Sequence, residues 1–267
     1  MGLIDCHNHL QDERLAEMRP QIVEDLRSEG VTWWGVAGTS EDDWEEVARL
    51  AEAHPEVMPS FGLHPWKVEG RSHRWKARLR DCLERFPGSG VGEIGLDKWI
   101  RDADIDDQKV VFREQLAIAA ELGRPVTIHC LQAWGSLLEE WRACGAGIRA
   151  VLHSFGGPTE LLDDFAGAGA WFSLSGYFFR RDKRRKLEVF RSVPGDRLLL
   201  ETDAPDMALP AYLDSRGGAF PGDGAECSVN HPANITVVYT EAARFLGEDV
   251  GSLAERMERN AERWWKG

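Results

Sequence analysis

Short apolar runs alternate with longer amphipathic stretches along the whole chain. Each run is apolar or rich in β-branched residues, as buried parallel strands are. Such runs occur eight times, at residues 3–7, 31–37, 57–64, 91–95, 125–129, 149–153, 171–175 and 197–202. Because parallel strands need a long crossover, usually a helix, this alternation predicts a repeated strand and helix unit.

The clearest predicted helix spans residues 105–122. Phe112, Leu116 and Ala119 fall on one face of it, and acidic residues fill its first turn. Gly123 follows directly and predicts its end.

Strand, helix and strand in alternation imply parallel pairing with right-handed crossovers. Eight strands are the number that a closed barrel of this kind requires. We therefore predict an α/β fold, a (β/α)8 TIM-type barrel that forms a single domain over residues 1–267. A doubly wound open sheet is the alternative.

The composition is that of a globular protein, with 43% hydrophobic and 29% charged residues among 267. No apolar run approaches the roughly 20 residues of a membrane span, so we expect no membrane association. The five cysteines form no C-x-x-C pair, and we interpret them as reduced thiols of a cytoplasmic protein. With 45 acidic and 32 basic residues the net charge is −13. This charge disfavours broad attachment to nucleic acid but does not exclude a nucleic-acid substrate.

Two histidines end the first apolar run. His7 and His9 are two positions apart, so their side chains point to the same face of a strand and can bind one metal ion. By itself the pair is also compatible with two unrelated polar residues at a strand end, although the metal pair is the favoured interpretation.

Other predicted strands also end in ionisable side chains. The carboxyl ends of barrel strands meet at one rim, so we expect these side chains to converge there. They are His64, Glu93, His129, His153 and Asp203.

Together with His7 and His9, and leaving His64 aside, this set holds four imidazoles and two carboxylates. That is more than one divalent ion needs, and it suits two ions that share a bridging carboxylate. We predict Glu93 as the bridge and two groups of further ligands: His7, His9 and Asp203 for one ion, and His129 and His153 for the other.

Several motifs together resemble the TatD-related metal-dependent hydrolases, within the amidohydrolase-like metallo-barrels. They are the H-x-H start, G-L-H-P at 62–65, G-E-I-G-L-D at 92–97, the strand-ending His129, H-S-F-G-G at 153–157, E-T-D-A-P at 201–205 and N-H-P-A-N at 230–234. The resemblance extends from residue 2 to about residue 263. It implies a TIM-type barrel with a two-metal centre and phosphodiester hydrolysis, usually magnesium-dependent trimming of DNA ends.

The resemblance also implies site roles. The ligands would be His7, His9, Glu93, His129, His153 and Asp203, with His64 near the scissile phosphate. Two positions depart from the pattern of such relatives. Leu131 stands where an arginine is usual, which removes an expected phosphate contact. Trp66 stands where a second histidine is common.

The resulting hypothesis is in-line attack on phosphorus by a water that two divalent ions activate. Mg²⁺ is the expected ion, with Mn²⁺ or Zn²⁺ as alternatives, because all three accept mixed histidine and carboxylate ligands. Asp203 would accept the proton, Glu93 would bridge the ions, and His64 would hold or protonate the phosphate. The expected partner is the end of single-stranded DNA or of another nucleic acid, with no obligate protein partner.

Two other functions remain open from the residues. The first is a binuclear-metal amidase, esterase or lactonase for a small molecule; such enzymes often use a carboxylated lysine as the bridge, whereas the fourth strand here offers Glu93. The second is a non-catalytic metal-binding or scaffold protein, for which a missing ligand would be expected, and none is missing.

Two segments break the repeat. Residues 180–186 hold six basic residues and one acid, which suits either a phosphate-binding groove or the solvated face of a helix. Residues 204–232 are rich in glycine and proline, as a lid or binding loop would be. Four aromatic residues after strand ends could stack on a base, although packing is the commoner role: Trp99, Trp134, Tyr177 and Phe178.

Overall fold

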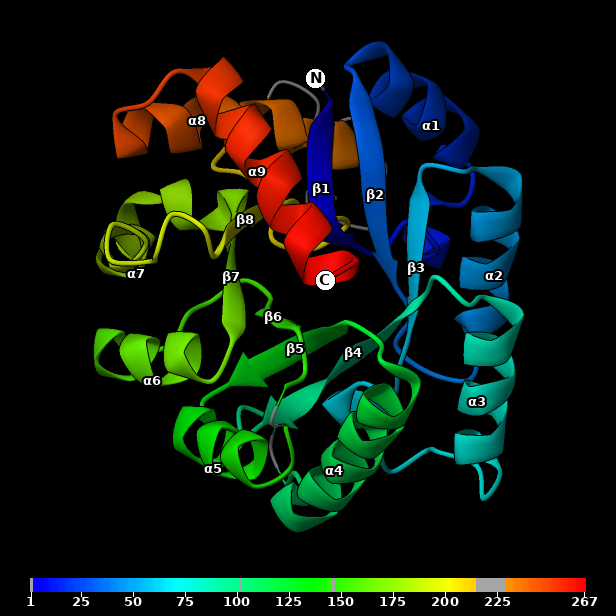
Figure 1. Ribbon diagram of the computed structural model, residues 1–267. Coiled ribbons are helices and arrows are strands. Elements are labelled where there is room, and N and C mark those ends of the chain that lie inside the picture. The colour runs from blue at the N-terminus through cyan, green and yellow to red at the C-terminus, as the bar shows by residue number, and fades with distance from the viewer. Residues whose placement is uncertain (1, 101, 146, 215–228) are drawn as a thin grey trace.

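The computed structural model describes residues 2–100, 102–145, 147–214 and 229–267. Within this part of the chain, eight strands form one parallel sheet (Figure 1). They are Leu3–Asn8 (β1), Val31–Ala37 (β2), Val57–Phe61 (β3), Gly90–Asp97 (β4), Val126–Leu131 (β5), Ala150–Leu152 (β6), Ala170–Ser175 (β7) and Leu198–Glu201 (β8).

Helices surround this sheet in Figure 1. The α-helices are Arg19–Ser28 (α1), Trp44–Ala53 (α2), Trp75–Arg85 (α3), Ile105–Leu122 (α4), Trp134–Cys144 (α5), Leu162–Gly167 (α6), Arg184–Val189 (α7), Ile235–Leu246 (α8) and Val250–Trp265 (α9). Short 3-10 turns precede several of them, among them Pro65–Lys67, Gly176–Phe179, Arg181–Lys183 and Pro232–Asn234.

Helix α4 confirms the predicted bounds of 105–122. The Asp104 side chain accepts hydrogen bonds from the backbone N–H groups of Asp106 and Asp107, so it caps the first turn. Gly123 ends the helix at φ 65°, a left-handed conformation that glycine adopts without a steric cost.

The strands follow one another in chain order around the sheet, and each neighbouring pair is parallel. Backbone bonds join the end of β1 to the residues after β8: Asp203 N–H donates to His7 O over 3.0 Å, and His9 N–H donates to Ala204 O over 2.7 Å. The predicted barrel is therefore confirmed. The alternative of a doubly wound sheet is wrong, because that fold reverses its strand order at a switch point.

Strand ends differ from the sequence prediction in ways that matter for the site. Strand β3 ends at Phe61 rather than at residue 64, so His64 lies on the loop after it. Strands β6 and β8 likewise end before His153 and Asp203. Strand β4 is longer than predicted and continues to Asp97, so Glu93 lies in its middle.

Helix α9 covers the end of the barrel at which the strands begin. Trp265 Nε1 donates to Gly88 O before β4, and Asn260 Nδ2 donates to Leu198 O at the start of β8. Trp264 joins a buried cluster with Ile4 and other strand residues. One end of the barrel is thus sealed, which leaves the carboxyl ends of the strands for binding and chemistry. In the described part of the chain, no helix combines the length and apolarity needed to cross a membrane.

Candidate metal centre

Two segments from opposite ends of the sequence meet where the barrel closes. His7 and His9 come from β1 and the residue after it, and Asp203 comes from the loop after β8. Asp203 has a φ of 54°, a left-handed conformation that is uncommon for residues other than glycine. Non-glycine residues in this region concentrate at functional sites, and the backbone bond from Asp203 to His7 holds the conformation in place.

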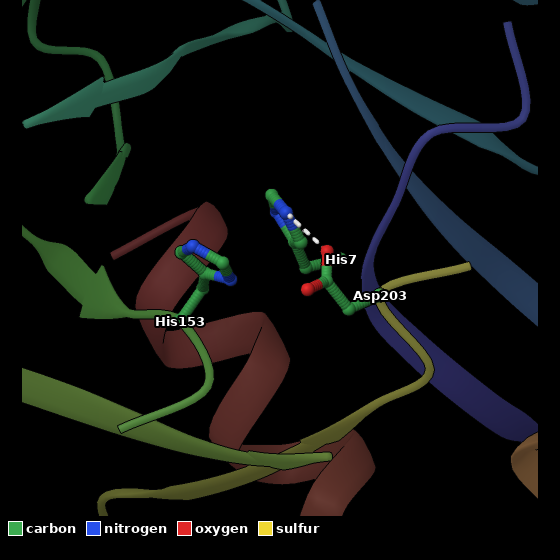
Figure 2. A group of neighbouring side chains, drawn as sticks. All are labelled: His7, His153 and Asp203. Atoms are coloured by element: carbon green, nitrogen blue, oxygen red, sulfur yellow. Dashed lines mark ion pairs between the residues drawn. The ribbon is translucent and has the colours of Figure 1, made fainter. Parts of the chain in front are cut away.

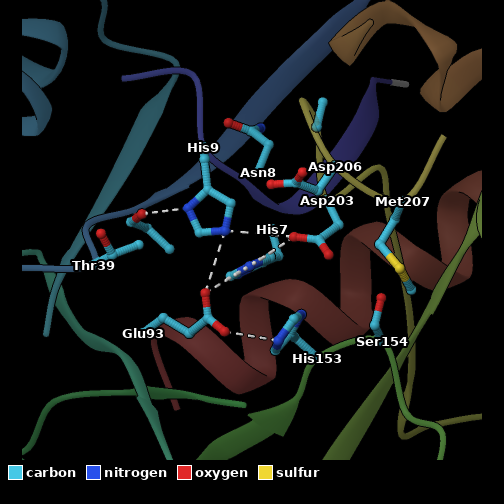
Figure 3. A network of polar contacts seen from close by, with 12 residues as sticks. His7, Asn8, His9, Thr39, Glu93, His153, Ser154, Asp203, Asp206 and Met207 are labelled. Atoms are coloured by element: carbon cyan, nitrogen blue, oxygen red, sulfur yellow. Dashed lines mark hydrogen bonds and ion pairs between the residues drawn. The ribbon is translucent and has the colours of Figure 1, made fainter. Parts of the chain in front are cut away.

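Glu93 lies at the centre of the cluster and is 2% exposed. Its two carboxylate oxygens face different sets of imidazoles (Figure 3). Oε2 lies near the Nε2 atoms of His7 at 3.4 Å and His9 at 3.3 Å. Oε1 lies near His64 Nε2 at 3.3 Å, His129 Nδ1 at 3.1 Å and His153 Nε2 at 2.8 Å.

Asp203 closes one side of the cluster. Its Oδ1 lies 3.3 Å from His7 Nε2 and 3.5 Å from His9 Nε2. The ring of His153 stacks on that of His7 with centroids 4.2 Å apart, so His153 and Asp203 flank His7 from two sides (Figure 2).

The ligand atoms fall into three overlapping groups within 4.8 Å: His7, His153 and Asp203; His7, His9 and Glu93; and His64, Glu93 and His129. All six predicted ligands and His64 therefore lie together. The grouping differs from the predicted division in one respect, because His153 also lies with His7 and Asp203. The sequence could not show this, since His7 and His153 stack across the barrel mouth.

Hydrogen bonds behind the cluster orient two of the imidazoles. The Nδ1–H of His9 donates to Ala37 O over 2.8 Å, which directs Nε2 to the centre. The Nε2–H of His129 donates to Asp97 Oδ2 over 2.9 Å, which directs Nδ1 to Glu93. Such outer bonds fix the tautomer and the orientation of histidines that bind metal ions.

Three buried acids support the cluster and were not predicted to do so. Asp97 also accepts hydrogen bonds from Trp66 Nε1 over 2.7 Å and from Trp99 N–H over 2.6 Å. Asp5 accepts from the Thr202 backbone and hydroxyl, and Glu201 accepts from Ser154. All three lie within or next to the motifs that suggested the ligands. Their closeness in sequence to a predicted ligand is the signal that could have identified them as supporting residues.

Burial and charge act in opposite directions on the acids of the cluster. Burial alone would raise the pKa of Glu93, but the surrounding imidazoles, His153 and His64 foremost, hold that pKa well below its usual range. Burial raises the pKa of Asp5 to about 7, against the hydrogen bonds from Thr202 and Asn8. Burial also lowers the pKa of His64 to about 4. The cluster therefore favours an ionised Glu93 among imidazoles.

The residues present fit a divalent metal. His7 is 1% exposed, yet neither of its ring nitrogens makes a hydrogen bond within the described residues. A buried polar atom without a partner is costly, and a metal ion bound at Nε2 would satisfy it. Imidazole nitrogens with carboxylate oxygens are also a donor set that divalent cations accept.

The described parts of the other segments singled out in the sequence follow the carboxyl ends of β7 and β8. Residues 180–186 form a 3-10 turn and the start of α7, and most of their side chains are exposed. Arg180 and Lys183 lie over the ring of Tyr177, at 5.4 and 5.1 Å from its centroid. Of the Gly- and Pro-rich stretch 204–232, residues 215–228 lie outside the described residues.

The four aromatic candidates separate by burial. Trp134 packs against Phe155 and Phe178 against Phe190, so these two serve as packing residues. Tyr177 is partly buried, whereas Trp99 is 63% exposed.

Comparison with known proteins agrees with the fold and the motifs. A family model described as TatD related DNase matches residues 4–266. The 3'-5' ssDNA/RNA exonuclease TatD of Pantoea vagans is 32% identical over 266 residues, covering 97% of each chain. The protein of the same name from Erwinia tasmaniensis is 30% identical over 266 residues, covering 98% of each.

Solved structures agree as well. The crystal structure of YJJV, a TatD homolog from Escherichia coli, has a TM-score of 0.88 and 26% identity, and the match covers 99% of this chain and 98% of that one. A TatD family hydrolase from Entamoeba histolytica has a TM-score of 0.87 at 18% identity, with 99% and 98% covered, which shows the shared fold. Because both the family model and the curated relatives match nearly end to end, the chain belongs to the family of TatD related DNases.

Proposed function

We propose that this chain is a metal-dependent exonuclease that removes nucleotides from the 3' end of single-stranded DNA or RNA. Residues 1–267 would form one catalytic domain. The relatives at 30–32% identity carry the name of that activity. The observation that supports the proposal most is the position of Glu93, whose two oxygens face separate sets of imidazoles.

This geometry suits two divalent ions, with Mg²⁺ the expected pair and Mn²⁺ or Zn²⁺ as alternatives. Glu93 would bridge them. His7, His9 and Asp203 would hold one ion, and His129 and His153 the other. Bound there, the ions would supply the positive charge that acidifies a water molecule and polarises the phosphate.

The histidine rings differ in which nitrogen carries the proton, and this difference suits them to different roles. His9 and His129 each donate one N–H away from the centre, so each presents a lone pair to an ion. His64 differs from His9 and His129, because its protonated nitrogen faces the centre of the cluster. Its Nδ1 accepts the Trp66 backbone N–H over 3.1 Å, so the neutral ring carries its proton on Nε2, which faces the centre. His64 is therefore suited to donate a hydrogen bond to a phosphate oxygen.

Asp203 is the candidate proton acceptor. Its Oδ1 faces His7 and His9, and the carboxylate is held at the rim by its own backbone bond to His7. A carboxylate so fixed can take a proton from an attacking water without a large movement.

Cleavage of end-labelled oligonucleotides tests this function. We expect an oligonucleotide labelled at its 5' end to shorten stepwise from the 3' end in Mg²⁺ or Mn²⁺, and not in EDTA. Asp203→Ala and His129→Ala should each lower kcat by a factor of about 100 or more while far-UV circular dichroism stays unchanged. Glu121→Ala, in an exposed ion pair with Arg80 away from the cluster, is the control that keeps activity. Hydrolysis of aryl esters without cleavage of any oligonucleotide would instead favour a small-molecule esterase.

A further inference from the structure

Trp66 is a large aromatic residue that the fold leaves open to solvent beside the metal centre. It is 53% exposed, whereas most tryptophans of the described chain are buried or partly buried. Its ring centroid lies 5.1 Å from that of His64 and 6.2 Å from that of His129. An exposed indole at this distance is within reach of whatever group is joined to a phosphate bound at the cluster.

The ring is held in one orientation. Its Nε1–H donates to Asp97 Oδ2 over 2.7 Å, and the backbone N–H of Trp66 donates to His64 Nδ1 over 3.1 Å. Asp97 is fully buried, so the carboxylate that accepts the indole N–H is held in a fixed position. A ring fixed by its edge offers its face to a flat partner at little entropic cost.

Space for such a partner exists beside the ring. Trp66 lines a pocket of about 480 Å³, a volume within the usual range for small-molecule sites. The other side chains of the wall include three acids, two bases and one leucine: Glu41, Asp42, Glu69, Lys67, Arg71 and Leu63. An excess of acids disfavours a phosphate in this pocket and suits an uncharged, flat group.

The two departures from the family pattern meet at this place. Asp97 binds the Trp66 indole and pairs in register with Leu131 across β4 and β5. Leucine thus stands where the resemblance implies an arginine, and its neighbour in the sheet, Asp97, holds the exposed indole. This side of the mouth therefore offers an aromatic face and, at residue 131, no cation for a phosphate.

We propose that Trp66 is the stacking platform for the nucleobase of the terminal or penultimate nucleotide, with the base entering the pocket beside it. The inference rests on the proposed exonuclease function, because a nucleotide joins a flat base to its phosphate through one sugar. Stacking of this kind tolerates any base, since every base has an aromatic face.

The test compares two single-stranded oligonucleotides that differ only in their last two nucleotides, which are base-bearing in one and abasic in the other. Affinity of the metal-loaded protein is measured by fluorescence anisotropy with oligonucleotides whose last linkages are non-hydrolysable, and KM and kcat are measured separately on cleavable oligonucleotides in Mg²⁺. The wild-type protein should bind the base-bearing oligonucleotide about tenfold more tightly than the abasic one. Trp66→Ala should bind both equally, at the level of the wild-type protein with the abasic oligonucleotide.

Two further variants separate stacking from other roles of the residue. Trp66→Phe keeps an aromatic face and loses the bond to Asp97, so it should retain most of the preference for a base. Trp99→Ala is the matched control, because Trp99 is more exposed and does not line the pocket. It should retain the full preference.

The failures of the two proposals are distinguishable. Equal binding of both oligonucleotides by the wild-type protein, or loss of the preference in Trp99→Ala rather than in Trp66→Ala, overturns the stacking proposal and leaves the exonuclease in place. Absence of cleavage with every metal overturns the exonuclease proposal, and the anisotropy measurement still decides whether Trp66 senses a base.

Discussion

Replacing Asp97 by asparagine should weaken metal binding although Asp97 is not itself a predicted ligand. The carboxylate is fully buried and accepts three hydrogen bonds. Its Oδ2 serves His129 and Trp66, and its Oδ1 serves the Trp99 backbone. Asparagine has nearly the same shape but offers one acceptor oxygen and one NH₂ group.

The expected magnitude follows from this count of donors. Whichever way the amide is turned, at least one of the three N–H groups faces another donor. A buried donor without an acceptor costs about 1–3 kcal/mol, and we expect the free energy of unfolding to fall by that amount. His129 also loses the anionic partner that directs its Nδ1 to the centre. Loss of such an outer partner lowers metal affinity by about 10- to 100-fold.

Two measurements check this prediction. Isothermal titration of Mn²⁺ into chelator-treated protein gives the metal affinity, and urea unfolding gives the stability. Asp107→Asn is the matched control, since Asp107 forms a partly exposed ion pair with Arg71. It should change stability by less than about 1 kcal/mol and leave the metal affinity unchanged. If Asp97→Asn lost stability but bound Mn²⁺ as tightly as the wild-type protein, Asp97 would support only the fold, and the assigned tautomer of His129 would be wrong.

Two further substitutions test other parts of the molecule. Arg184 and Arg185 place positive charge in the first turn of α7, where the helix dipole disfavours it, so we expect them to serve the nucleic-acid backbone rather than the helix. Changing both to glutamate should make the salt dependence of oligonucleotide binding shallower by about 1.4 in log–log slope, whereas an unchanged slope identifies a plain solvated surface. Phe172 is fully buried in β7 with its ring 5.0 Å from that of Phe155. Phe172→Ala should destabilise the protein by about 3–5 kcal/mol in urea unfolding, and a loss below 1 kcal/mol would show that the core repacks.

The barrel could be predicted from sequence because its signals are local. Apolar runs mark the strands, and helix α4 carries its own cap at Asp104 and its own stop at Gly123. Convergence of the polar residues followed from topology alone, since all parallel strands of a barrel end at one rim. The candidate ligands could therefore be predicted without knowledge of any side-chain contact.

The orientation of each ligand could not be predicted in this way. The ring of His9 is set by a carbonyl at Ala37, and that of His129 by the carboxylate of Asp97. These partners lie 28 and 32 residues away in sequence, and no local pattern links them. The same holds for the stacking of His153 on His7, which brings His153 beside the candidate ligands predicted for the other ion.

In the proposed enzyme, chemistry and substrate selection would occupy different layers of the site. Glu93 and His7 are almost fully buried, so their positions depend on the barrel itself. Trp66 and Leu131 lie outside that layer and are exposed. On this proposal a substitution of Trp66 would change which group is bound and leave the inner candidate ligands in place, because within the described residues the Trp66 side chain is bonded to them only through Asp97. The departures from the family pattern should therefore appear in KM and in base preference, while kcat follows Glu93 and its imidazoles.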